Sequence, residues 1–238
     1  VVALDRFGAD DVASAFDHFS SLAAEAIVVI APVDSLAEAV ASQGASVPVV
    51  AVSGGRTFGR GVSVVHADQR GGARALAEHL MSLGHRDIAC VAGPQEWFEA
   101  RERVAGWREA MDGAGLSKRE PLVGSWEARW GYVAGQNLVE DGLPDAVMCA
   151  NDEVAVGLLR AFAEAGVSVP GDVSVTGFDD VPLAAYAGPG LTTVRQDFAD
   201  LGRCALEAVS HALDGESVDT YVRPTRLVVR GSTGVCPR

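Results

Sequence analysis

The sequence contains no apolar run near the length of about 18 residues that a membrane-spanning helix requires. Its richest apolar stretch, Ala26–Pro32, has only the length of a strand. No signal peptide can be recognised. Because the chain opens with Val1 and not with Met, we expect it to be a fragment whose true N-terminus is missing. We expect no membrane partner.

Positive charge is scarce. Only 19 Lys and Arg residues stand against 32 Asp and Glu residues, which gives a formal net charge of -13. DNA affinity depends on Lys and Arg that neutralise phosphates, and an acidic surface repels the phosphate backbone. We therefore expect that this piece by itself does not bind nucleic acid.

Cysteine is also rare, and the four present show no CxxC or Cys/His ligand spacing. They are Cys90, Cys149, Cys204 and Cys236. Cys90 and Cys149 lie in apolar strand-like runs, which predicts buried free thiols. Free thiols favour a reducing compartment, and we expect a cytoplasmic protein.

The known catalytic motifs are missing or incomplete. The run Ser53-Gly54-Gly55 is similar to an ATP-pyrophosphatase loop, but Thr57-Phe58 stands where that loop needs Asp-Ser. The sequence also lacks the Gly-Lys-Ser/Thr of a P-loop, the GxSxG of a nucleophile elbow and a GxGxxG after its first strand. His79 and His85 are six residues apart and suit no helical metal pair. We therefore expect no enzyme, no metal site and no cofactor.

Short apolar runs alternate with longer amphipathic segments. Buried parallel strands that are covered by helices on both faces have this pattern. With 48% hydrophobic residues, the chain can bury a full core. The predicted strands are Val1–Asp5, Ile27–Ala31, Pro48–Ser53, Ser63–His66, Asp87–Ala92, Leu122–Ser125, Ala146–Ala150 and Val173–Phe178.

Helices are predicted between the strands. Apolar residues recur at i, i+3, i+4 and i+7 in Gln69–Leu83 and in Asp152–Ala165, and Gly84 and Gly166 end these two segments. Repeated strand–helix alternation indicates an α/β fold with doubly wound parallel sheets.

The end of the chain breaks this rhythm. The strand Leu191–Val194, the helix Ala199–Leu213 and the strand Arg226–Arg230 follow without βαβ spacing. Such a tail would allow the chain to cross between two lobes.

Six blocks in order, over about 160 residues, resemble the ligand-binding domain of the lactose-repressor/galactose-repressor (LacI/GalR) family. They are Ala77 to Leu80 with Leu83 to Ala89 and Ala92-Gly93-Pro94; Arg101, Arg103 and Gly106-Trp107; Pro144 to Val147 with Ala150-Asn151-Asp152 and Ala155-Val156-Gly157; Val169 to Asp180; Leu191 to Val194 with Gln196-Asp197-Phe198 and Leu201-Gly202; and Leu227 to Thr233.

The resemblance implies two doubly wound lobes of the periplasmic-binding-protein-like type I fold, joined by three crossovers. The N-terminal lobe would hold residues 1–67 and 198–222, without its first strand and helix. The C-terminal lobe would hold residues 68–197 and 223–238. A helix-turn-helix segment and a hinge helix, which the family normally carries, are not in this sequence.

The function implied is that of an effector-sensing domain in a bacterial transcription regulator. A small molecule, expected to be a sugar, would bind between the lobes, and the full protein would be a homodimer that contacts DNA only through the missing segment. A nucleobase or a phosphorylated sugar remains open as the effector. One rival is a periplasmic sugar-binding protein of a transporter, and another is an enzyme on a flavodoxin-like scaffold.

Polar groups for sugar hydroxyls are expected on loops at the carboxyl ends of parallel strands. Asn151 and Asp152 follow one predicted strand, and both also suit the N-cap of a helix. Asp179 follows another strand, and a helix cap is again the alternative. The resemblance makes Arg103 an inward-facing ligand residue, whereas a surface salt bridge is the alternative.

Aromatic side chains could stack on a sugar ring. The candidates are Trp97, Trp126 and Phe198, with core packing as the alternative for each. Gln196 and Asp68, near the crossovers, are second-tier candidates. Ser53 stands where the family often places Asp, and a hydroxyl cannot form the charge-assisted bond of a carboxylate. The ligand is therefore expected to be smaller than a hexose, differently oriented, or of another class.

Overall fold

The structure of the protein is a computed structural model. It describes Val2 and residues 9–42, 47–54, 58, 61–216 and 220–237. The predicted strand Val1–Asp5 thus lies outside the described residues, except for Val2. The chain divides into two compact units. Unit 1 comprises Val1–Asp68, Glu96–Glu99 and Asp197–Arg223, and unit 2 comprises Gln69–Gln95, Ala100–Gln196 and Pro224–Arg238.

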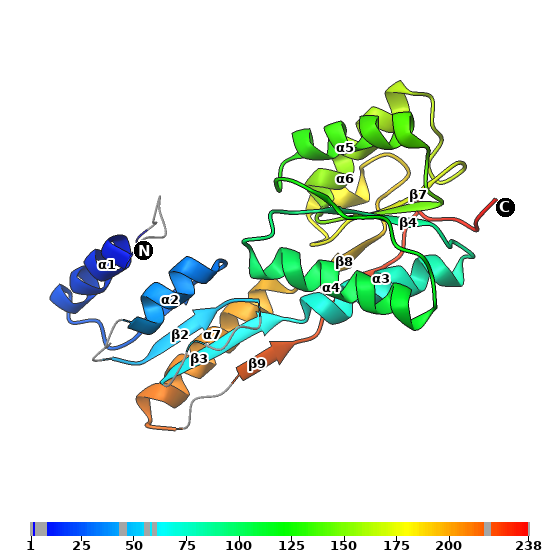
Figure 1. The fold of residues 1–238 in the computed structure, drawn as a ribbon. Helices are drawn as coiled ribbons and strands as arrows, with labels where there is room; N and C mark the ends of the chain where they lie inside the picture. The colour runs from blue at the N-terminus through cyan, green and yellow to red at the C-terminus, as the bar shows by residue number, and fades with distance from the viewer. Residues whose placement is uncertain are drawn as a thin grey trace. The chain divides into compact units, whose positions relative to one another are not determined.

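Unit 1 is built on a parallel four-stranded sheet in the order β1-β2-β3-β9. Successive strand residues point to opposite faces, so each face packs against different helices. Val49 and Ala51 share a core with α1 and α2, whereas Val50 and Val65 pack against α7 (Figure 1). The elements are α1 (Ala9–Ser21), β1 (Ile27–Ile30), α2 (Asp34–Ser42), β2 (Val49–Val52), β3 (Val62–Ala67), α7 (Phe198–Leu213) and β9 (Thr220–Arg223).

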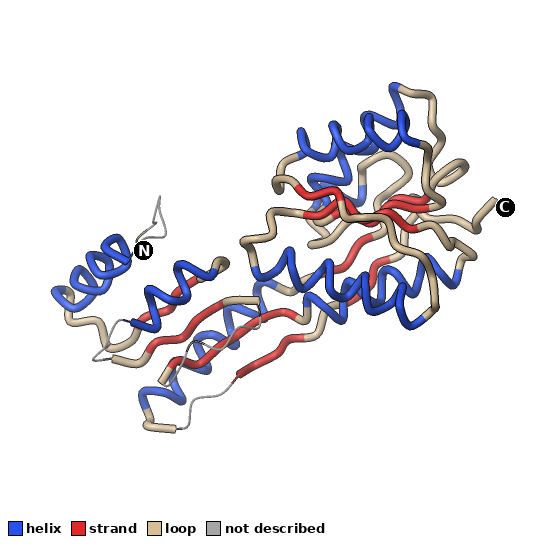
Figure 2. Tube along the Cα trace, in the orientation of Figure 1, coloured by secondary structure: helices blue, strands red, loops and turns tan. Residues whose placement is uncertain are grey.

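Unit 2 contains a second parallel sheet in the order β5-β4-β6-β7. Helices α3 and α4 cover one face, and α5 and α6 cover the other (Figure 2). Every residue of β4 and β6 is buried, as expected for strands covered on both sides. The elements are α3 (Gln69–Ser82), β4 (Ile88–Ala92), α4 (Phe98–Gly113), β5 (Leu122–Val123), α5 (Ala128–Asp141), β6 (Ala146–Cys149), α6 (Asp152–Glu164) and β7 (Ser174–Thr176).

The last part of unit 2 extends this sheet edge. The short helix η1 (Pro182–Ala185) leads to β8 (Thr193–Arg195), which pairs antiparallel with β10 (Arg226–Val228). Single parallel bridges link Thr176 to Thr192 and Asp179 to Arg195, so β8 runs beside the end of β7. The chain thus returns to unit 2 after α7 and β9, and closes the edge of the sheet there.

The predicted α/β class with two parallel sheets is confirmed, and so are the buried free thiols of Cys90 and Cys149. Burial raises the pKa of the Cys90 thiol to about 12, so it is inert at neutral pH. Strand β9 is one that the apolar runs do not predict, because its four residues alternate between exposed and half-buried positions. None of the described helices is both long and apolar enough to cross a membrane.

The expected lobe ranges differ from the two units by one residue at each crossover, because Asp68, Asp197 and Arg223 belong to unit 1, and they also differ at one inserted stretch. They place residues 96–99 in the second lobe, whereas the structure assigns Glu96–Glu99 to unit 1. The reason is local pairing: the amide of Phe98 donates to the carbonyl of Pro32 at 2.9 Å, and Trp97 bridges Val33. The side chains of Trp97 and Phe98 also join the core of α1 and α2.

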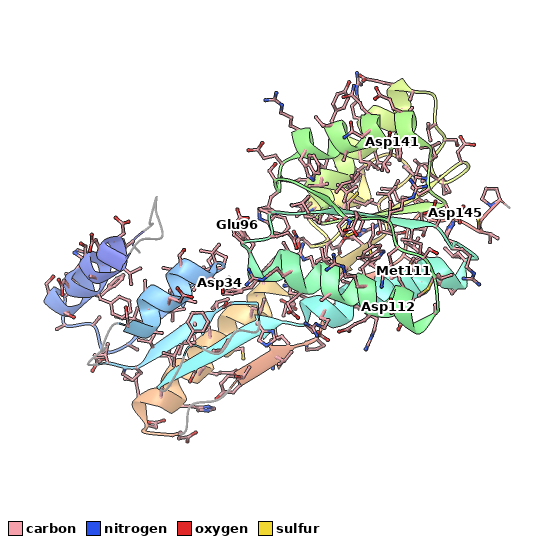
Figure 3. The ribbon with its side chains drawn as sticks, viewed as in Figure 1. Asp34, Glu96, Met111, Asp112, Asp141 and Asp145 are labelled. Atoms are coloured by element: carbon pink, nitrogen blue, oxygen red, sulfur yellow. The ribbon has the colours of Figure 1, made fainter. Side chains whose placement is uncertain are left out.

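The two neighbouring histidines hold the C-terminal segment of unit 2. His85 Nε2 lies 3.0 Å from the carbonyl of Gly234, and His79 Nε2 lies 3.1 Å from the hydroxyl of Thr233. Burial lowers the pKa of both imidazoles, which favours their neutral forms. Close by, Asp145 precedes β6 and accepts the backbone amides of Arg86 and Asp87 at 3.0 Å each (Figure 3).

Candidate functional site

Polar side chains meet at the carboxyl ends of β6 and β7 in unit 2. Ala150 and Asn151 follow β6, and Asp179 comes three residues after β7. Arg103 reaches the same place from the second turn of α4. In parallel sheets this edge is the usual place for a ligand site, because the loops that leave the strands converge there.

Arg103 is the centre of this arrangement, with only 7% of the residue exposed. Its Nε donates to Gln69 Oε1 at 2.8 Å, and Nη2 donates to Asp179 Oδ1 at 3.1 Å. Its Nη1 donates to the carbonyl of Ala150 at 2.5 Å. The guanidinium is thus fixed from three directions, and its charge is matched by the carboxylate of Asp179.

Two glutamines close the arrangement into a ring. Gln69 Nε2 donates to Gln196 Oε1, and Gln196 Nε2 donates to Asp179 Oδ1, both at 2.6 Å. We call Arg103, Gln69, Gln196 and Asp179 the Arg103 ring. The bonds from Arg103 and from Gln196 to Asp179 both end on Oδ1. Oδ2 of Asp179 therefore has no hydrogen-bond partner among the described residues and can accept from a ligand.

Aromatic groups flank the guanidinium. The guanidinium carbon of Arg103 lies 3.9 Å from the centroid of the Phe178 ring and 5.4 Å from that of Trp126. A cation over an aromatic face is attracted by the electron density of the ring. Trp126 also packs against the backbone at Gly93, where an added Cβ would come within 2.8 Å of the indole. The site therefore combines fixed polar groups with rigid apolar surface.

Asn151 joins the Trp126 loop to α6. Its Oδ1 accepts the amide of Val154 at 2.8 Å, and its Nδ2 donates to the carbonyl of Trp126 at 3.1 Å. The N-cap alternative is therefore present in the structure. It leaves Asn151 only 8% exposed, so a contact with a ligand would add to capping and would not replace it.

Asp152 occupies a different environment from its neighbour, with 1% of the residue exposed. Its Oδ1 accepts from the Thr193 hydroxyl at 2.6 Å, and its Oδ2 accepts from the Val181 amide at 2.8 Å. Both oxygens are thus used within unit 2. This carboxylate joins α6 to β8 and to the loop after β7, and its role as a ligand contact stays a prediction.

Asp179 and its neighbour form a strained turn, since the φ angles of Asp179 and Asp180 are 106° and 56°. The Asp180 carboxylate accepts from Arg230 Nη2 and Arg195 Nε, both at 2.6 Å. Burial alone would raise the pKa of Asp180, but the two arginines lower it below its ordinary value. The two ion pairs of Asp180 thus stabilise the turn that presents Asp179.

Known proteins share this architecture. A family profile described as "Periplasmic binding protein-like domain" matches residues 77–233. The transcriptional regulator CelR of Thermobifida fusca is 38% identical over 190 residues, which cover 76% of this chain and 56% of that protein. The chain belongs to the LacI/GalR family.

Solved structures of LacI/GalR proteins match nearly the whole chain. A CelR–cellobiose complex superposes with a TM-score of 0.84 at 30% identity, and covers 94% of this chain and 70% of that chain. A dimeric Lac repressor with a C-terminal deletion superposes with a TM-score of 0.86 at 28% identity, and covers 99% and 87%. The chain spans about half the length of the curated relatives it matches.

The remaining candidates belong to unit 1. Trp97 is half-buried in the core beside α2, which favours the packing alternative. Phe198 opens α7 and is 60% exposed. Ser53 follows β2 and is buried, and its Oγ has no hydrogen-bond partner within the described part of the chain. Asp68 follows β3 and closes the first stretch of unit 1. Their roles as LacI/GalR ligand contacts stay predictions.

Gln69 is a ring residue that the sequence patterns do not single out. Its place at the start of α3, directly after β3, was the available signal, because this is the carboxyl end of a parallel strand. Within the part of the chain that the structure describes, no three His, Cys, Asp or Glu side chains form a group able to hold a metal ion.

Asp152 leads to a pH prediction for this LacI/GalR domain. Burial raises the pKa of its carboxyl to about 6 from an ordinary value of 3.8. The native state therefore binds this proton more tightly than the unfolded chain does, so the native state loses stability as pH rises from 4 to 6. Relative to Asp152→Asn, the wild type should gain up to about 3 kcal/mol of unfolding free energy between pH 7 and pH 4. Urea unfolding at a series of pH values measures this difference, and a flat or opposite trend would contradict it.

Proposed function

We propose that this chain is the effector-sensing domain of a DNA-binding transcription regulator, and that it binds a neutral sugar through the Arg103 ring. The observation that carries the proposal is the buried pair of Arg103 and Asp179, fixed at the carboxyl edge of β6 and β7 beside Trp126. Its relatives are transcription regulators, and a CelR structure of the same family holds cellobiose.

The chemistry of the ring favours an uncharged polyol. The positive charge of Arg103 is already balanced by Asp179 at 3.1 Å, so a phosphate or a carboxylate would meet a carboxylate beside its expected counter-ion. Sugar hydroxyls can accept from the guanidinium and donate to Asp179 Oδ2 in the same pose. The indole of Trp126 offers an apolar plate to the C–H face of the sugar ring.

The mechanism that we propose is a ligand-dependent change in the relative orientation of the two lobes. A sugar can shift that equilibrium only by the difference between its affinities for the two orientations. Coupling is reciprocal, so DNA bound by the full protein would change sugar affinity by the same factor. The full protein would be a cytoplasmic homodimer that contacts DNA through a helix-turn-helix segment outside this sequence, and it would use no cofactor and carry out no catalysis.

A thermal-shift screen tests this function. The panel contains cellobiose, lactose, D-ribose, D-glucose, two sugar phosphates and two purines. A ligand at one hundred times its dissociation constant should add about 2.7 kcal/mol of stability, which is a shift of several degrees. Stabilisation by a neutral sugar is the expected result.

Two outcomes would contradict the proposal. Stabilisation by a sugar phosphate or a purine, without any neutral sugar, would overturn the polyol class. Conversion of a bound sugar to product, followed by chromatography of the incubated mixture, would favour the enzyme alternative. The alternative of a periplasmic binding protein is disfavoured because the relatives named above are a transcriptional regulator, CelR, and the Lac repressor.

A further inference from the structure

We infer that Gln69 is a positioning residue of the ligand site, because it joins Arg103 to the segments through which the chain crosses between its two units. This inference rests on the proposed function. Apart from the short stretch Glu96–Glu99, the chain crosses between its units three times. The first two of these crossovers lie between Asp68 and Gln69 and between Gln196 and Asp197. Gln69 and Gln196, the residues of unit 2 at these two crossovers, are bonded side chain to side chain at 2.6 Å. We call this pair the crossover clasp.

The clasp is shielded from water, since Gln69 is 5% and Gln196 is 8% exposed. A buried amide that loses its partner retains an unsatisfied donor or acceptor, which costs more than the hydrogen bond contributes. The two crossovers are therefore held together by a contact that solvent does not readily replace. Opening the clasp requires new partners for both amides.

Each amide in the ring has only one workable orientation. Arg103 can only donate and ionised Asp179 can only accept, so Gln69 must turn its oxygen toward Arg103, and Gln196 must turn its nitrogen toward Asp179. The remaining ends then face each other as a donor and an acceptor. The charges of the ligand site thus set the polarity of the clasp.

The third crossover is joined to the first by the backbone. The amide of Asp68 donates to the carbonyl of Arg223 at 2.9 Å, and Arg223 is the last residue of unit 1. The Arg223 side chain is in turn paired with Asp200 on α7. The bond between the side chains of Gln69 and Gln196 therefore connects the first two crossovers. The backbone bond between Asp68 and Arg223 connects the first crossover to the third.

The arrangement makes the crossovers respond to the ligand. Gln196 and Arg103 share one oxygen of Asp179, so a sugar hydroxyl that binds the other oxygen of Asp179, or binds Arg103, acts on the groups to which the two glutamines are bonded. Gln69 lies behind Arg103 and acts through it. A substitution at Gln69 should therefore change sugar affinity and the local stability of the crossovers together.

The test compares Gln69→Leu and Gln69→Glu with a matched control, Gln136→Leu. Gln136 is exposed on α5 of the same unit, with its amide 3.3 Å from the Tyr132 hydroxyl. Hydrogen exchange of the ligand-free proteins is measured for peptides that span residues 66–70 and 193–198. Titration calorimetry with cellobiose, lactose and D-ribose measures affinity.

Gln69→Leu should speed exchange in both crossover peptides about tenfold and weaken sugar binding about tenfold. A tenfold change is what the loss of about one buried hydrogen bond predicts. Gln69→Glu has the same shape and keeps an acceptor for Arg103, but it cannot donate to Gln196. It should therefore also speed exchange, whereas a residue that acts only by packing would tolerate it. The control should change neither measurement.

A double variant isolates the clasp itself. Gln69→Leu combined with Gln196→Leu should speed exchange by less than the product of the two single effects, because both changes remove the same contact, although each also removes one bond of its own. Wild-type exchange in Gln69→Leu and Gln69→Glu would overturn the clasp. If the wild type binds none of the sugars, the proposed function fails, but the exchange of the ligand-free proteins still decides whether the clasp exists.

Discussion

Replacing Asp179 with alanine should abolish sugar binding and lower the unfolding free energy of the domain by about 3–5 kcal/mol. The side chain of Arg103 is 8% exposed, so removing the carboxylate takes a charge-assisted bond away from a buried guanidinium. Gln196 loses the acceptor of its amide by the same change. Urea unfolding measures the loss of stability, and calorimetric titration with the sugar found by the thermal-shift screen measures binding.

Two further variants separate folding from binding. Arg103→Met with Asp179→Leu removes both charges and should recover much of the stability while binding stays absent, because no charge is left buried and unpaired. Asp87→Ala is the matched control, since Asp87 pairs with Arg119 in the same unit with both side chains more than a third exposed. An exposed pair should contribute less than about 1 kcal/mol. A similar loss in Asp87→Ala and Asp179→Ala would contradict the special role of the buried pair.

The parts of the fold that repeat locally could be predicted from the sequence. The apolar runs of β4 and β6 are continuous because both faces of the sheet are covered. Each residue of these strands is therefore buried and apolar. The i, i+4 pattern likewise located α3 and α6, with ends that agree within two residues. Strand β9 has no such continuous apolar run, because it lies at the edge of the sheet among the described strands, beside β3, and stays partly exposed.

The division of roles between Asn151 and Asp152 could not be predicted. Both residue types suit a helix cap and a sugar hydroxyl, and both stand at the start of α6. What separates them is a partner far along the chain, because Asp152 bonds Thr193, 41 positions later. A local pattern contains no information about a contact of that separation.

Gln69 shows the same limit more clearly. Its place after a parallel strand is a signal that it shares with other polar residues at the start of a helix. Its partners are Arg103 and Gln196, 34 and 127 positions away, and only the fold brings them together. The resemblance to LacI/GalR proteins identified Arg103, Asp179 and Gln196 as candidates, and the structure adds the residue that connects two of them.

The contact between α5 and α6 leads to the second large effect, which concerns stability alone. An added Cβ at Gly157 would lie 1.7 Å from the carbonyl oxygen of Ala128, and one at Gly131 would lie 1.8 Å from that of Val154. In both cases the obstacle is backbone, so no side chain can move aside. The two helices must separate, and the core that they share with the sheet must open with them.

Gly157→Ala should therefore destabilise the domain by about 3 kcal/mol or more, although alanine is the better helix former. Gly202→Ala is the matched control, because Gly202 lies inside α7 and its added Cβ meets none of the described atoms within 4 Å. It should gain about 0.5–1 kcal/mol from helix propensity. The same substitution is thus expected to have opposite signs in two helices, and urea unfolding of both variants measures it. Similar stabilities would show that α5 and α6 can separate without loss, and would contradict the close backbone packing of this face.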